Sequence, residues 1–170
     1  MENEKSSVLY AYQKLLNETY NLVDDAQIAR VGRYLKEAER VLACGSEGFH
    51  LIVREMQFRF MQAGVNITAV RNLDMIKLRT AFLDQYSLAF GFLIREDVND
   101  ILFFLKEAHM KGAKTVLLTT ESRNVSDEYC DEVIWIPSLT DWDYGSIISP
   151  ISPFLVVLDI LYSYYATSER

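Results

Sequence analysis

The stretch from Ser87 to Thr119 reads SLAFGFLIREDVNDILFFLKEAHMKGAKTVLLT. It begins and ends with short, almost continuously apolar runs, SLAFGFL and TVLLT, and a helical pattern over residues 97–111 separates them. Strands covered on both faces have this composition, and a helix between two such strands is typical of a right-handed parallel crossover. The stretch therefore predicts a parallel sheet with helices on both faces.

The same alternation extends in both directions along the chain. Helices at 49–63, 73–82, near 125–130 and from about 147 to 167 are expected to alternate with further strands at 41–44, 66–70 and 132–137. Pro150 and Pro153 either fall in the first turn of the last helix or delay its start to about Phe154. The chain is predicted to be an α/β protein, a three-layer αβα sandwich whose five-stranded parallel sheet has the flavodoxin-like order 2-1-3-4-5.

A pair of helices is expected before the first strand. In residues 6–22, apolar side chains recur at three- and four-residue steps, which predicts one amphipathic face made of Leu9, Tyr12, Leu15, Leu16, Thr19 and Leu22. A second helix is expected from Asp25, interpreted as its cap, to Ala38. We expect residues 1–24 to form a linker helix and residues 25–170 to form one domain.

Composition excludes several classes of protein. Half of the 170 residues are hydrophobic, which argues against disorder, and a net charge of -7 argues against DNA binding by this segment alone. Cys44 and Cys130 lie far apart in sequence without a second pair of metal ligands, so neither a disulfide framework nor a metal site is expected, and no cofactor is expected either. The sequence lacks the features of a signal peptide and an apolar run of the ~18 residues that span a membrane, so we expect no membrane association and a cytoplasmic location.

Candidate binding residues lie in three loops that follow predicted strands, because ligands bind at the carboxyl ends of parallel strands. The candidates are Gly45, Ser46 and Glu47 after the first strand, Arg95 and Glu96 after the third, and Thr119, Thr120 and Ser122 after the fourth. Ordinary turn, capping and solvated roles are the alternative for each loop. The 141–144 segment, Asp-Trp-Asp-Tyr, is a possible lid or a simple edge contact. The two histidines, His50 and His109, form no recognisable triad or metal cluster, so no catalytic residue is assigned.

Several of these stretches resemble the sugar isomerase (SIS) domain. They are the turn CGSEG at 44–48, QAGVN at 62–66, the helix and strand KEAHMKGAKTVLLT at 106–119, and Cys130-Asp131 followed by VIWIP at 133–137. The helical pair and the tail SPISPFLVVLDILY at 149–162 are similar to the RpiR/MurR family of bacterial transcription regulators. Those regulators carry a helix-turn-helix domain that this sequence lacks. The resemblance therefore implies DNA contact only through such a domain, and either a fragment of a longer regulator or a stand-alone domain.

The site departs from the family pattern. Family members offer a Ser in the first loop and an S-x-S-G-x-T run in the second, and both bind the phosphate of a sugar phosphate. Here Glu47 takes the first position, with Ser46 beside it, and the second run reads LIREDV at 93–98. Losing these neutral donors is expected to weaken or redirect phosphate binding. The isomerases that share the fold use a Glu and a His, but no histidine follows His109.

We therefore expect a non-enzymatic domain that binds an effector and forms a homodimer. The expected effector is a small carbohydrate derivative, phosphorylated in the family. Two alternatives stay open. One is a degenerate SIS domain that serves dimerisation alone, and the other is a sugar-phosphate isomerase that uses Glu47 and His50.

Overall fold

The computed structural model describes residues 2–46, 48–93, 98–120, 128–139 and 147–168. Five parallel strands form its sheet: β1 (Arg40–Gly45), β2 (Ile67–Val70), β3 (Ser87–Leu93), β4 (Lys114–Thr119) and β5 (Glu132–Trp135). Their order is β2-β1-β3-β4-β5, and every neighbouring pair is parallel. The predicted fold class and strand order are confirmed.

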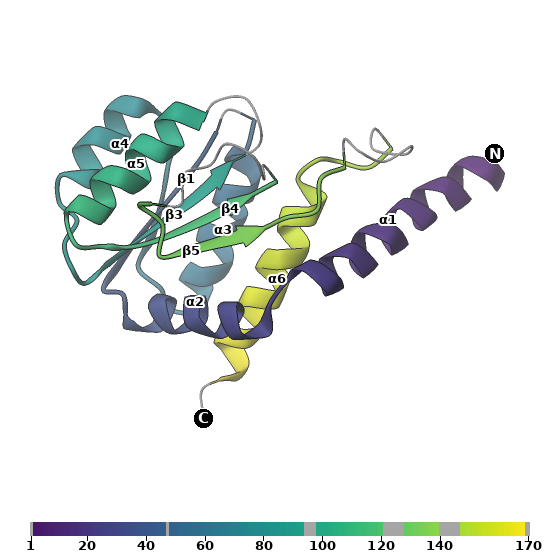
Figure 1. Ribbon diagram of the computed structural model, residues 1–170, viewed down its shortest axis with the longest axis horizontal. Coiled ribbons are helices and arrows are strands. Elements are labelled where there is room, and N and C mark those ends of the chain that lie inside the picture. The colour runs from purple at the N-terminus through teal and green to yellow at the C-terminus, as the bar shows by residue number, and fades with distance from the viewer. Residues whose placement is uncertain (1, 47, 94–97, 121–127, 140–146, 169–170) are drawn as a thin grey trace.

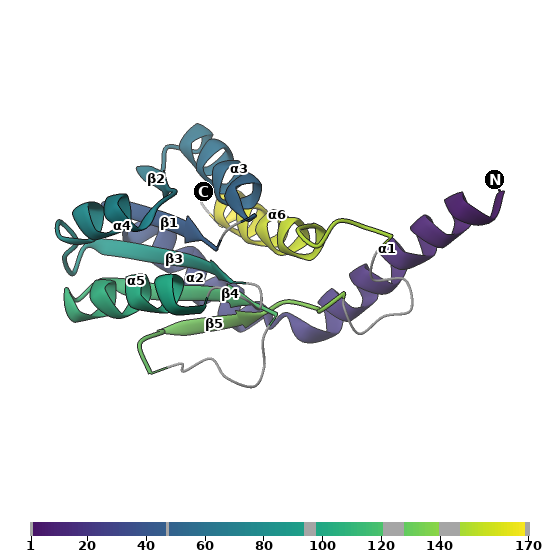
Figure 2. The same cartoon turned by 90° about the horizontal axis from the view of Figure 1, so that it is seen from above.

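Helices cover both faces of this sheet (Figures 1 and 2). One face carries α2 (Asp25–Glu37), α3 (His50–Gln62) and α6 (Ser152–Thr167), and the other carries α4 (Leu73–Thr80) and α5 (Val98–Met110). Successive residues of a strand point to opposite faces, so Val41 and Ala43 join the first core whereas Leu42 and Cys44 join the second. All residues of β3 are buried, as expected for the central strand of a sheet covered on both sides.

Several element boundaries differ from the predicted ones. Asp24, not Asp25, caps α2, because its carboxylate accepts a hydrogen bond of 3.0 Å from the Ala26 amide. The last helix begins at Ser152, later than the predicted 147, with Pro153 in its first turn, where no amide is needed. The helix expected near 125–130 falls largely outside the described residues, and its described end, at 128–130, is a turn.

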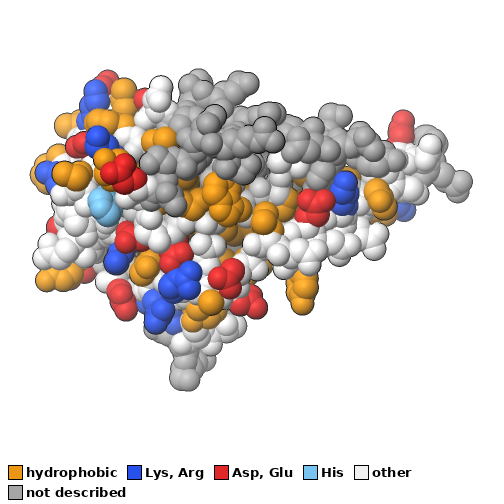
Figure 3. Space-filling view, viewed as in Figure 1, with side chains coloured by type: hydrophobic (Ala, Val, Ile, Leu, Met, Phe, Trp, Pro, Cys, Tyr) orange, Lys and Arg blue, Asp and Glu red, His pale blue; other side chains and the backbone are white. Residues whose placement is uncertain are grey.

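The N-terminal helix α1 (Glu2–Leu22) projects from the domain (Figures 1 and 2). Its inner side packs through Ala11 and Leu15 against Leu139 and Ile148, and the buried Thr19 hydroxyl donates a 2.8 Å hydrogen bond to the Leu15 carbonyl. The apolar face predicted for this helix is therefore only partly buried, because Leu15 and Thr19 face the domain whereas Leu9 and Leu16 are exposed. The exposed side chains on the outer side are Leu9, Leu16 and Tyr20. Hydrophobic side chains are visible on the surface of this projecting helix in Figure 3.

Among the described residues, no helix combines the length and the apolar character that crossing a bilayer would require. The predicted boundary between a linker helix and the domain, at residue 24, stays a prediction.

Candidate functional site

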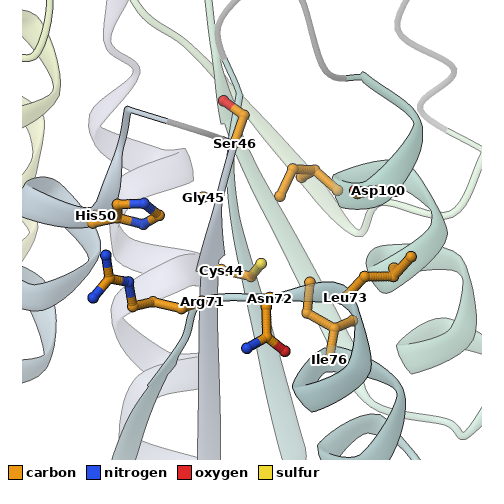
Figure 4. A pocket seen from close by; sticks show the side chains of 10 residues that line it. Cys44, Gly45, Ser46, His50, Arg71, Asn72, Leu73, Ile76 and Asp100 are labelled. Atoms are coloured by element: carbon orange, nitrogen blue, oxygen red, sulfur yellow. The ribbon is translucent and has the colours of Figure 1, made fainter.

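A cavity of about 500 Å³ opens at the carboxyl ends of β1 and β2. Figure 4 shows it from close by. Its walls come from two strand ends and from the first turns of three helices. The lining residues are Cys44, Gly45, Ser46, His50, Arg71, Asn72, Leu73, Ile76, Asp100 and Ile101. Because β1 has β2 on one side and β3 on the other, the cavity lies where the strand order reverses, which is where open parallel sheets bind their ligands.

Ser46 supplies a buried hydroxyl to this cavity. Its backbone is fixed, since its amide donates to the Phe92 carbonyl at 3.1 Å and its carbonyl accepts from the Phe49 amide at 2.9 Å. The residue is only 6% exposed, yet its Oγ has no hydrogen-bond partner within the part of the chain that the structure describes. Buried polar groups are nearly always paired, so this hydroxyl is free to bind a ligand group or a water molecule.

Gly45 lets α3 approach the end of β1. A Cβ at this position would lie 2.8 Å from Val53 Cγ2 and 3.0 Å from Phe49 Cβ, closer than side chains tolerate. The glycine therefore serves helix packing, and this packing places His50, the first residue of α3, in the cavity wall.

The loop between β2 and α4 also lines the cavity, and the sequence prediction missed it. Asn72 caps α4 by accepting a 2.8 Å hydrogen bond from the Met75 amide, which fixes the loop that carries the exposed Arg71. An arginine followed by a helix-capping asparagine, directly after an apolar strand, was the available signal. The predicted strand order, which places β2 beside β1, would have assigned this loop to the same edge as the first one.

Two further lining residues, Cys44 and Asp100, differ in charge. Burial raises the pKa of the Cys44 thiol to about 12, with a smaller contribution from Asp100, so this thiol is neutral at pH 7. Asp100 is exposed in the first turn of α5. In Figure 4, Arg71 and His50 lie on the same side of the cavity and Asp100 lies across from them.

The predicted candidates are thus only partly gathered at the cavity. Gly45 and Ser46 line it, whereas Thr119 and Thr120 lie at the end of β4, the second strand from β1, and are not among the lining residues. The other four, Glu47, Arg95, Glu96 and Ser122, lie outside the described residues, as does the 141–144 segment. A binding role for each of the eight candidates stays a prediction.

No protein-family model matches the chain. Two curated proteins are similar to it in sequence. An uncharacterized HTH-type transcriptional regulator of Haemophilus influenzae is 26% identical over 160 residues, covering 94% of this chain and 56% of that protein. A second uncharacterized HTH-type regulator, from Clostridium perfringens, is 21% identical over 150 residues, covering 88% of this chain and 53% of that protein. The chain thus spans about half the length of these relatives.

Solved structures share the fold. The sugar isomerase domain of an RpiR transcription factor from Sphaerobacter thermophilus has a TM-score of 0.84 at 20% identity, covering 97% of this chain and 90% of that one. The NanR protein of Vibrio vulnificus, complexed with ManNAc-6P, has a TM-score of 0.76 at 18% identity, with coverages of 98% and 62%. A putative phosphosugar isomerase from Bacteroides fragilis has a TM-score of 0.77 at 14% identity, with coverages of 96% and 90%.

These comparisons confirm the resemblance found in the sequence. The fold is that of the SIS domains, and the sequence relatives are HTH-type transcription regulators.

Proposed function

We propose that this chain is the effector-binding and dimerisation domain of an RpiR-type transcription regulator, and that it senses a phosphosugar or a related carbohydrate derivative in the cytoplasm. The observation that carries the proposal is the buried, unpartnered Ser46 hydroxyl in a cavity of about 500 Å³. A sugar presents several hydroxyls that can pair with such a group, and pockets of this volume bind small metabolites. The sequence relatives named above support a role in transcription.

Sensing without catalysis fits the groups around the cavity. Moving a proton between two carbons of a sugar requires an acid and a base placed on either side of the substrate. Of the two described histidines, His50 lines the cavity and His109 does not. The cavity meets α5 at its first turns, through Asp100 and Ile101, whereas His109 lies in the last turn of that helix. The Cys44 thiol stays protonated and is a poor base.

Dimerisation is supported by the outer side of α1. Leu9 and Leu16 are 59% and 52% exposed, and Tyr20 is 86% exposed, so the helix presents an apolar stripe to solvent. A projecting helix gains stability mainly by packing such a stripe. A second copy of the chain would cover it. An effector then acts by binding one dimer geometry better than another, and the attached helix-turn-helix domains transmit the difference to DNA.

Thermal unfolding of the purified chain against sugar phosphates, amino sugar phosphates and their unphosphorylated forms tests the sensing role. A ligand at 100 times its Kd adds about 2.7 kcal/mol of stability, which corresponds to a Tm increase of roughly 5 to 10 °C for a chain of this length. A flat panel would contradict sensing and favour a domain that serves dimerisation alone.

A fold shared with putative isomerases makes a sugar-phosphate isomerase the second candidate. It requires turnover of an aldose or ketose phosphate that Glu47→Gln and His50→Gln each abolish. Such turnover would overturn the non-enzymatic proposal.

A further inference from the structure

Charge is distributed unevenly around the cavity. Arg71 follows β2 and His50 begins α3, and both lie on one side in Figure 4. Asp100 belongs to α5 and lies on the other side. Ser46 follows β1, which runs between β2 and β3 in the sheet. Among the described lining residues, the cationic Arg71 thus lies on one side of the cavity and the anionic Asp100 on the other.

Three charged or polar side chains of the cavity have no partner among the described residues. Arg71, His50 and Asp100 form no ion pair or hydrogen bond with any residue that the structure describes, although three other ion pairs are present there. The other lining residues that the structure describes are apolar or neutral, including the protonated Cys44 thiol and the side chains of Leu73, Ile76 and Ile101. Within the described part of the chain, a ligand can thus pair with both charges without displacing another side chain.

We propose that the ligand is zwitterionic, an amino sugar phosphate with a free amine, bound with its phosphate at Arg71 and its ammonium group at Asp100. This inference rests on the proposed function and adds the class and orientation of the ligand. A guanidinium binds phosphate oxygens through two parallel hydrogen bonds, and His50 adds a further donor on the same side. The Asp100 carboxylate accepts hydrogen bonds from an ammonium group. A sugar whose amine is acetylated, or replaced by a hydroxyl, lacks this group.

The opposite orientation is disfavoured by the same charges. A phosphate beside Asp100 would meet a like charge, and an ammonium beside Arg71 would do the same. The orientation also explains how the chain could bind a phosphate without the hydroxyl run of the second loop, because Arg71 comes from a different loop.

Titration calorimetry with glucosamine 6-phosphate, glucose 6-phosphate, N-acetylglucosamine 6-phosphate and glucosamine tests this proposal. Arg71→Ala should weaken binding of the phosphorylated sugars about tenfold or more, since hydrogen bonds to charged groups are lost, and Arg71→Lys should recover part of it. Glucosamine 6-phosphate should bind to the unmodified chain several-fold more tightly than glucose 6-phosphate and N-acetylglucosamine 6-phosphate, which lack a free amine. Asp100→Asn should remove this preference, so that glucosamine 6-phosphate and glucose 6-phosphate bind with similar affinity.

Two exposed residues of α4 that do not line the cavity provide matched controls. Arg79→Ala removes an arginine and Asp74→Asn removes a first-turn carboxylate, and both should leave all affinities unchanged. The Tm of each variant without ligand shows that it is folded.

The outcomes separate this inference from the proposed function. If the unmodified chain binds no phosphorylated sugar, both fail. In a second outcome, the unmodified chain binds a phosphorylated sugar with an affinity that Arg95→Ala lowers and Arg71→Ala does not. The phosphate then lies at the second loop, and only the inference fails. An unchanged preference for the amine in Asp100→Asn would overturn the ammonium contact.

Discussion

Arg30 on α2 and Glu132 at the start of β5 form an ion pair that ties the helix to the edge strand. The Arg30 Nε lies 2.5 Å from Glu132 Oε1, and a second guanidinium nitrogen lies 3.2 Å from Oε2. Gln27 Nε2 donates to the same Oε2 at 3.0 Å. Although the Glu132 side chain is only 9% exposed, the hydrogen bond from Arg30 lowers its pKa below the usual 4.5, against the opposing effect of burial.

This ion pair predicts a pH-dependent stability. Because the pKa of Glu132 is lower in the folded state than in the unfolded state, its stabilising effect is complete above pH 4.5 and is lost as the pH falls through the lowered pKa. Glu132→Gln should lower the free energy of unfolding at pH 7, and its difference from the unmodified chain should shrink towards pH 3. Urea unfolding across this range measures the difference. Asp159→Asn, which breaks an exposed ion pair with Arg59, should cost little. A difference independent of pH would contradict the assignment.

Gly45 is predicted to be required for packing. Gly45→Ala should lower the free energy of unfolding by about 1 to 3 kcal/mol, because the new methyl group would overlap Val53 and Phe49. Chemical denaturation measures the loss. Val53→Ala makes room for the methyl, so the double variant should lose less than the sum of the two single losses. Simple additivity would show that the overlap is relieved elsewhere.

Ser46→Ala should separate stability from binding. Removing a buried hydroxyl that lacks a partner should leave the free energy of unfolding unchanged or raise it by about 1 kcal/mol. The same change should weaken ligand binding, which titration against the sugar phosphates measures. A clear loss of stability without any effect on affinity would indicate a structural role for the hydroxyl.

The two cysteines should differ in reactivity. Cys44 is buried with a pKa of about 12, so at pH 8 only about one thiol in ten thousand is ionised, whereas Cys130 is partly exposed. Absorbance with a disulfide reagent should therefore show one fast thiol in the native chain and two after unfolding. Cys130→Ser should remove the fast phase, and a fast phase that persists would contradict the burial of Cys44.

The sheet was readable from the sequence because its strands are buried on both faces. Runs such as SLAFGFL leave little choice of structure, and the predicted bounds of β3, Ser87–Leu93, match the observed ones. Helix ends were harder, since a capping side chain one position away satisfies the same amides, as Asp24 does in place of Asp25. The apolar positions of α1 predicted a helix but not which of them face the domain, because residues distant in sequence, Leu139 and Ile148, decide that.

The cavity was only half predictable for a related reason. Gly45 and Ser46 follow an obvious strand and stand in a glycine-containing turn. Asp100 carries no local motif and Arg71 is marked only by the capping Asn72 that follows it, so the arrangement of β2, β1 and α5 in space is what brings the two charges to one cavity. Long-range topology therefore determines the charged part of the site.

The exposed apolar stripe on the outer side of α1 predicts that the chain forms a dimer. Leu9→Glu combined with Leu16→Glu places two charges on this stripe and leaves the inner contacts of Ala11 and Leu15 intact. If a second copy covers the stripe, sedimentation analysis should show a dimer for the unmodified chain and a monomer for the variant, because burying unpaired carboxylates is unfavourable. Leu78→Glu, an equally exposed leucine on α4, is the matched control and should leave the dimer unchanged. A dimer that survives the double substitution would place the interface on another surface, whereas a monomeric unmodified chain would remove the dimer from the proposed function.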